Sequence, residues 1–120
     1  MKFVDSTLVG VDFNSSFLED VTFVNCNLVY SNFSGCNIRN VKFENCKLDD
    51  ASFNGLKWKS MVFDNCSMKG VEFFQTKLKD VDVSNCQISD LRVPIDGLKG
   101  LIVSYEQAVG LSLLLGIKIK

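Results

Sequence analysis

Residues 21–60 read VTFVN CNLVY SNFSG CNIRN VKFEN CKLDD ASFNG LKWKS. Each unit of five holds a small residue, a polar residue, Phe or Leu, another polar residue and, in most units, Asn, Asp or Gly at its end. The pattern continues without slipping to Phe73. A fixed short period is typical of a solenoid, in which each repeat packs on its neighbours. This stretch therefore decides the fold class.

The centre of the unit is apolar throughout the first hundred residues, at every fifth position from Phe3 to Leu98. The positions two before it are mostly small or apolar, as at Cys26, Val41 and Ala51. Apolar residues two apart lie on the same face of a strand, so each unit predicts a short strand with one buried face. Five residues cannot keep this alternation, and the fifth must break it with a turn.

The fifth position of the unit is mostly Gly, Asn or Asp from Asp5 to Gly100. These residue types accept a positive φ at low cost, which the third residue of a type II turn requires. A corner every five residues gives short sides, and four sides close a coil of twenty residues. Fifteen positions follow this rule: Asp5, Gly10, Asp20, Asn25, Gly35, Asn40, Asn45, Asp50, Gly55, Asn65, Gly70, Asp80, Asn85, Asp90 and Gly100.

A second period supports closure at four sides, because Phe and aliphatic centres alternate. Residues twenty positions apart are expected to stack in successive coils, which gives two columns of rings on opposite sides. Each coil then contains a nearly constant volume of side chains, as close packing requires. The misfit is Trp58 with Leu56, where we expect a local bulge and a partner for the indole N–H. The columns are Phe3, Phe23, Phe43, Phe63, Val83 and Phe13, Phe33, Phe53, Phe73, Val93.

The regular solenoid is expected to end near Pro94. Ile95 would place a β-branched residue at a positive-φ corner, and Asp96 would point a carboxylate inward. We therefore divide the chain into a repeat region, residues 1–100, and a C-terminal cap with its tail, residues 101–120.

The cap is predicted to contain one helix. Ser104 and Gln107 form a capping box, the helix runs over Tyr105–Leu115, and Gly116 supplies the left-handed residue after it. Residues 117–120 alternate like a short strand.

The predicted helix is apolar on more than one face, so apolar surface remains after it covers the last coil. A homodimer through this surface is our hypothesis. The interface residues would be Val109, Leu113, Leu114, Ile117 and Ile119.

The repeated unit resembles that of the pentapeptide-repeat family, summarised as A(D/N)LXX. The resemblance covers about residues 1–95, and residues 100–117 resemble the C-terminal cap of many bacterial members. It implies a right-handed quadrilateral parallel β-helix, an all-β solenoid, of about five 20-residue coils with a C-terminal α-helix cap. Some members bind DNA gyrase, a type II topoisomerase, and protect it from quinolones or toxins as mimics of DNA. Many others have no assigned activity.

The composition narrows the class of function. The chain has 120 residues, a formal net charge of -1, five cysteines and no histidine. One domain without a signal peptide or membrane-length apolar run is expected to be cytoplasmic, and an odd number of cysteines favours free thiols. Lack of histidine removes the commonest general base and metal ligand. No phosphate loop or nucleophile elbow is present, so we expect neither an enzyme nor a cofactor.

Four cysteines lie twenty residues apart, at Cys26, Cys46, Cys66 and Cys86, and Cys36 lies on the opposite side. Stacking at about 4.8 Å would put the sulfurs in a line, whereas zinc needs four ligands around one point. We expect inert buried thiols and no metal site.

One side of the predicted coil carries an outward basic face: Arg39, Lys57, Lys59, Lys77, Lys79 and Lys99. It would suit an anionic partner, or it is a solvated face that discourages aggregation. DNA mimicry is not favoured, because five coils would need on the order of fourteen net negative charges. Residues 1–100 hold thirteen acidic and eleven basic residues.

On the amino half, outward or corner positions hold apolar residues that suggest a protein contact: Val4, Val9, Phe17, Val24, Val29 and Tyr30. The sequence thus favours a rigid non-catalytic surface that binds an unidentified protein. The alternatives are a DNA-mimicking, gyrase-binding protector and an anion or nucleic-acid binder that uses the basic face.

Overall fold

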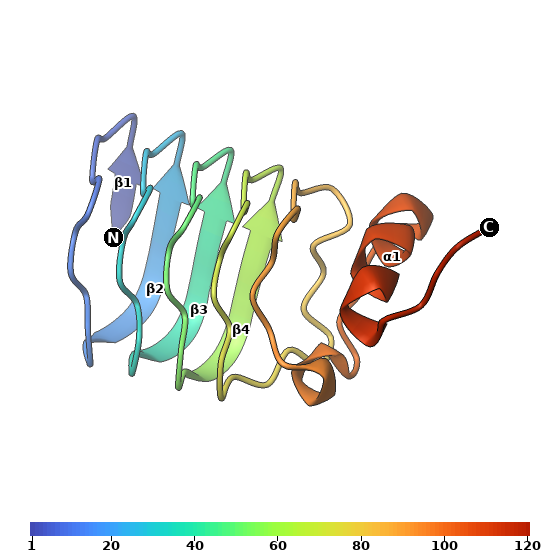
Figure 1. Cartoon of the computed structure of the whole chain (residues 1–120). Coiled ribbons are helices and arrows are strands. Elements are labelled where there is room, and N and C mark those ends of the chain that lie inside the picture. The colour runs from blue at the N-terminus through green and yellow to red at the C-terminus, as the bar shows by residue number, and fades with distance from the viewer.

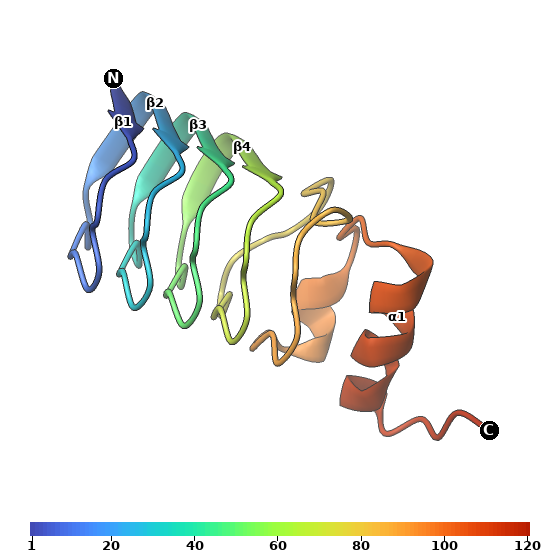
Figure 2. The ribbon, with the colours of Figure 1, turned by 90° about the horizontal axis from the view of Figure 1, so that it is seen from above.

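The computed structural model describes all residues, 1–120, and measures 47 × 25 × 22 Å. Its coils stack along one axis, and the carboxyl-terminal helix lies beyond the last of them (Figures 1 and 2). Four parallel strands form one sheet in the order β1-β2-β3-β4. They are β1 (Lys2–Val4), β2 (Phe17–Val24), β3 (Asn37–Glu44) and β4 (Lys57–Asp64).

The register of the sheet is twenty residues. Phe23 pairs with Phe3 before it and with Phe43 after it, so equivalent units lie directly over one another. Isolated bridges hold the other sides and continue the stack to Gln87, Arg92 and Ile102. The predicted β-solenoid is confirmed. Its regular sheet is shorter than the five coils expected, since only three strand pairings are continuous.

Left-handed backbone occurs at every fifth residue from Asp5 to Asp80, as the corner rule predicts. It also occurs where residue type gave no signal, at Ser15, Tyr30, Ser60 and Gln75. The exception is Asn85, whose φ is not positive. Its side-chain carbonyl instead accepts a hydrogen bond from the main-chain N–H of Asn65, at 3.1 Å. The corner expected at that residue was wrong because the last coil departs from the regular path.

The core is built from the two columns of Phe rings. In the first column, Phe23 and Phe43 stack with centroids 5.1 Å apart and an interplanar angle of 5°. In the opposite column, Phe33 and Phe53 stack at 4.8 Å and 7°. Rings from the two columns meet edge to face, as Phe33 and Phe43 do at 5.6 Å and 88°. Such pairs contribute about 0.5–1.5 kcal/mol beyond the burial of their area.

Trp58 does not cause the bulge that we expected. It stays in register with Ile38 inside β4, and its indole N–H finds the predicted partner, the carbonyl of Lys77. The irregularity lies one level later instead. No main-chain hydrogen bond joins β4 to residues 77–84. The Trp58 indole occupies one acceptor of that segment, the carbonyl of Lys77.

The regular units are interrupted near Pro94, as the sequence predicted, but pairing with the preceding coil resumes at Gly100 and Ile102. Pro94 precedes a 3-10 helix, η1 (Ile95–Leu98), so Ile95 escapes the positive φ of a corner. The Asp96 side chain is exposed and does not point inward.

The capping box of the C-terminal helix is confirmed. The Ser104 hydroxyl accepts from the N–H of Gln107 at 3.2 Å, and the Gln107 side chain accepts from the N–H of Ser104 at 2.8 Å. The α-helix is shorter than predicted. α1 (Tyr105–Leu111) tightens into a 3-10 helix, η2 (Ser112–Leu115), as the Ser112 hydroxyl donates to the Val109 carbonyl.

Gly116 has the predicted left-handed conformation, with φ 72°. The strand expected over residues 117–120 was wrong, since these residues are not in a strand. Alternation alone does not make a strand where no neighbouring backbone is available to pair with it.

Replacing one ring of the stack tests the packing. Phe43→Ala should lower the free energy of unfolding by about 3–5 kcal/mol, because it leaves a cavity among rings that cannot close in. Phe74→Ala, at a side chain that is 42% exposed, should cost less than about 1 kcal/mol. Urea titration followed by circular dichroism measures both, and equal losses for the two variants would contradict the packing argument.

Corner strain can be tested at Tyr30, which has φ 60° and is 65% exposed. Tyr30→Asn should raise the free energy of unfolding by about 1 kcal/mol, because Asn tolerates this conformation. Gly55→Ala should lower it by a similar amount, since an added Cβ meets nothing within 4 Å and only the left-handed backbone opposes it. Thermal unfolding checks both signs, and destabilisation by Tyr30→Asn would count against the idea.

Candidate protein-binding surfaces

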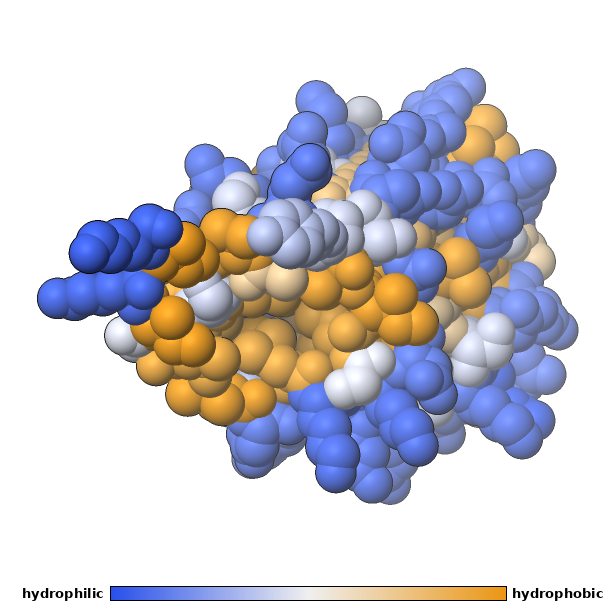
Figure 3. Space-filling view, turned by 90° about the vertical axis from the view of Figure 1, so that its right-hand side faces the viewer, coloured by the Kyte–Doolittle hydropathy of each residue, from blue (hydrophilic) through white to orange (hydrophobic).

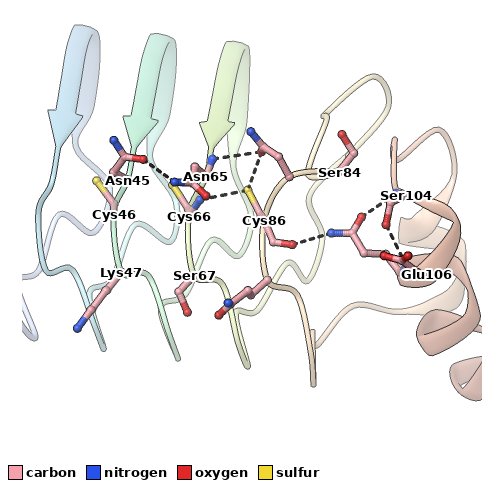
Figure 4. Close-up of a pocket in the computed structure, with 13 residues that line it drawn as sticks. Asn45, Cys46, Lys47, Asn65, Cys66, Ser67, Ser84, Cys86, Ser104 and Glu106 are labelled. Carbon is pink, nitrogen blue, oxygen red and sulfur yellow. Dashed lines mark hydrogen bonds between the residues drawn. The ribbon is translucent and has the colours of Figure 1, made fainter.

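The first surface is a shallow groove of about 510 Å³ along the cysteine side of the later coils (Figure 4). Side-chain amides bridge successive levels there, and Asn65 Nδ2 donates to Asn45 Oδ1 at 2.8 Å. Asn85 Nδ2 reaches Asp64 Oδ1 at 2.7 Å. These bonds satisfy the polar groups of the corner, so the groove is a structural ladder between coils.

All five cysteines are free and buried. Their thiols donate to main-chain carbonyls of the preceding coil, as Cys46 does to Phe23 at 3.3 Å and Cys36 to Phe13 at 3.0 Å. Figure 4 shows Cys46, Cys66 and Cys86 in a row along the stack. No group of three or more Cys, Asp or Glu side chains converges on one point as a zinc site would need.

The thiols differ in acidity. Burial raises the pKa of Cys36, and hydrogen bonding with the Cys46 and Cys86 thiols raises the pKa of Cys66. The same hydrogen bonds with Cys66 lower the pKa of Cys46 and of Cys86 to about 7. Burial, which keeps reagents away from all five sulfurs, is therefore what protects them from attack.

A thiol reagent tests this protection. Ellman's reagent should modify the native protein at least about a hundredfold more slowly than a small free thiol, because the sulfurs are buried. In urea all five cysteines should react. Rapid reaction of the native protein would show that the ladder opens. An unchanged reaction rate after addition of zinc is the matching control for metal binding.

A second polar cluster was missed by the sequence reading. The Glu72 carboxylate accepts from Asn54 Nδ2 at 3.1 Å, from the Ser52 hydroxyl at 3.2 Å and from Arg92 at 3.4 Å. These hydrogen bonds lower the pKa of Glu72, with Asn54 the largest cause. The sequence contains the information that predicts this cluster, because Ser52, Glu72 and Arg92 are spaced by twenty residues and therefore stack in successive coils.

All six residues of the predicted basic face are exposed on one side of the stack. The register places Arg39 beside Lys59, and Lys77, Lys79 and Lys99 line a second groove, of about 1010 Å³. None of the six cations forms an ion pair, since the two salt bridges are Lys42–Glu44 and Arg92–Glu72. Glu19 lies beside Arg39 in the register, so one acidic residue is set within this basic face.

The carboxyl-terminal cap exposes an apolar surface (Figure 3). The five residues predicted for a dimer interface are all partly or largely exposed, at 41–69%. The sequence reading missed Leu115 and Tyr105, which are 50% and 86% exposed and belong to the same cap. Together these side chains form the cap surface: Tyr105, Val109, Leu113, Leu114, Leu115, Ile117 and Ile119.

The apolar residues expected on the amino half are also at the surface, with Phe17 at 56% and Val9 at 51% exposure. They are spread over several sides of the first two coils, which makes a weaker patch than the cap. No helix in the structure has the length and apolar character needed to cross a membrane.

A family model described as a pentapeptide repeat region matches residues 1–73 and 40–94. The chain belongs to the pentapeptide repeat family. The match covers the predicted repeat region up to Pro94, the residue before η1.

Comparison with solved structures finds chains of low sequence identity. A trypsin-treated form of QnrB1, a plasmid-mediated fluoroquinolone resistance protein, is similar over 100% of this chain and 98% of its own, with 15% identity and a TM-score of 0.33. The pentapeptide repeat protein Rfr23 from the cyanobacterium Cyanothece 51142 is similar over 86% of this chain and 91% of its own, with 13% identity and a TM-score of 0.20. Comparison with curated protein sequences finds no match.

Proposed function

We propose that this protein is a non-catalytic scaffold that presents a rigid surface to another protein. The observation that carries the proposal is the cap surface, where large apolar side chains remain exposed at the end of an otherwise well-packed solenoid. Contiguous apolar surface of this kind is typical of a protein contact. The stacked rings and the backbone ladder behind it provide the rigidity.

The partner that best fits the cap surface is a second copy of the chain. A two-fold contact would place the same apolar residues opposite one another, and stable interfaces bury about 800 Å² on each partner. The charged residues of the cap are few, with Glu106 in the first turn of α1 and Lys118 and Lys120 in the tail. A low content of charged residues is typical of the centre of an interface.

Free thiols fit a reducing compartment, and a cytoplasmic location is part of the proposal. DNA mimicry has no support in the charge of the coils, and binding to DNA gyrase is tested directly by a supercoiling assay. Inhibition at micromolar protein would make that enzyme the partner.

Substitution on the cap tests the proposed contact. The wild-type chain should sediment as a dimer at micromolar concentration, and the double variant Leu113→Asp with Leu114→Asp should sediment as a folded monomer, because two carboxylates would have to be buried in the contact. Val62→Asp, at an exposed apolar residue of β4, is the control and should remain dimeric. Unchanged circular dichroism shows that each variant folds.

A wild-type chain that sediments as a monomer would refute the homodimer. The wider scaffold proposal is then tested by affinity capture with the wild type and the cap variant. A protein retained by the wild type and lost with the variant supports it. Capture of the same set of proteins by the wild type and by the cap variant would contradict the scaffold proposal.

A further inference from the structure

Cys46 and Cys66 hold their sulfurs in the same place in successive coils. The Cys46 thiol donates to the carbonyl of Phe23 at 3.3 Å, and the Cys66 thiol donates to that of Phe43, also at 3.3 Å. Each thiol also reaches the carbonyl two residues before it, at 3.3 Å for Cys46 and 3.5 Å for Cys66. Matching partners mean matching side-chain conformations. The two sulfurs are therefore separated by the spacing of neighbouring strands, about 4.8 Å.

The backbone on both sides of the two cysteines fixes this separation. Phe43 pairs with Phe63 before them, and Lys47 pairs with Ser67 directly after them, so the coils stay in register. A disulfide would need Cβ atoms about 3.8 Å apart, which is closer than the register brings them. The register therefore keeps two free thiols facing each other across successive coils.

The separation of the sulfurs suits a metal ion that binds two ligands in a straight line. Zinc needs four ligands around one point, and no such group is present. Cu(I), a soft monovalent ion, can bind two thiolates on opposite sides, and thiolates are the ligands that select it over harder ions. A metal–sulfur bond is about 2.3 Å long, so the two sulfurs of a linear site lie about 4.6 Å apart. This value is close to the spacing of the coils.

The groove of about 510 Å³ gives an ion a route to the pair. Cys46 and Cys66 line it and are neighbours in the row of sulfurs in Figure 4. Both residues are only 2% exposed, which excludes a bulky reagent but not a bare ion. Lys47 lines the same groove, and its positive charge would offset the negative charge that remains when one monovalent ion binds two thiolates.

We propose that Cys46 and Cys66 bind one Cu(I) ion in linear coordination between successive coils. The ion replaces the two thiol protons, which pass to solvent, and no electron is transferred. The inference goes beyond the proposed scaffold function and does not depend on it, because no residue of the cap surface takes part in the site.

Cys36 provides an internal reference for the pair. Its thiol is also buried and donates to a main-chain carbonyl, that of Phe13, at 3.0 Å. The residues twenty positions before and after it are Ser16 and Leu56, so no second sulfur is stacked on it. A cysteine of the same burial is therefore available without the neighbour that the site needs.

Two double variants with equal numbers of thiols test whether adjacent sulfurs are required. Cys26→Ala with Cys86→Ala keeps the pair and should bind one Cu(I). Cys46→Ala with Cys86→Ala leaves Cys26 and Cys66 two coils apart, at about 9.6 Å. This variant should bind Cu(I) at least about a hundredfold more weakly, since losing a ligand costs more than losing an outer partner. Fully buried Ala51 occupies the equivalent position of another unit, so the repeat accepts Ala there.

Competition with the Cu(I) chelator bicinchoninate, without oxygen, measures the affinities, and circular dichroism shows that each variant folds. Cys36→Ala is the single-site control and should change the affinity less than about twofold. An excess of zinc should not displace the copper, because the pair offers zinc only two of its four ligands.

X-ray absorption on the wild-type protein tests the geometry without any variant. Copper added below one equivalent should have two sulfur neighbours and no nitrogen or oxygen neighbours. Three or four neighbours would overturn the proposal. Equal affinity of the two double variants would also overturn it, because binding would then not need adjacent sulfurs, as would a wild-type protein that takes no copper from the chelator.

Discussion

The whole architecture depends on one backbone constraint, the left-handed residue that ends each unit of five. It turns the chain by one corner, so that four units return to the starting point one level higher, and the twenty-residue register follows from it. Asn, Asp and Gly make the corner at low cost. Tyr30, Ser60 and Gln75 adopt the left-handed conformation although it is unfavourable for their residue types. The packing of the neighbouring units holds them in it.

A repeated coil also needs a structure that covers its last level. A parallel stack exposes unpaired backbone at its last level, and it must be covered or paired. Here Gln107 covers part of it, since its side-chain amide donates to the carbonyl of Val83 at 2.8 Å and of Cys86 at 2.7 Å. The residue that completes the capping box of α1 thus also fixes that helix to the last coil.

The end of the solenoid is irregular on one side only. Trp58 takes the carbonyl of Lys77, the ladder between β4 and residues 77–84 is absent, and η1 then turns away from the strand path. Because the interior is filled by Phe rings, contacts with a partner are confined to the surface. The groove lined by Lys77, Lys79 and Lys99 and the cap surface differ there, since one is basic and the other is apolar.

The sequence by itself determined the solenoid, its period, the ring columns, the end at Pro94 and the capping box, because each is a local rule repeated many times or a short motif with its own hydrogen bonds. It also placed the basic face and the exposed apolar residues of the cap. Only the tertiary structure decided the rest: the different path at Asn85, the groove beside Lys77 and the unpaired tail. These features depend on how neighbouring coils share hydrogen bonds, which no single unit of five residues encodes.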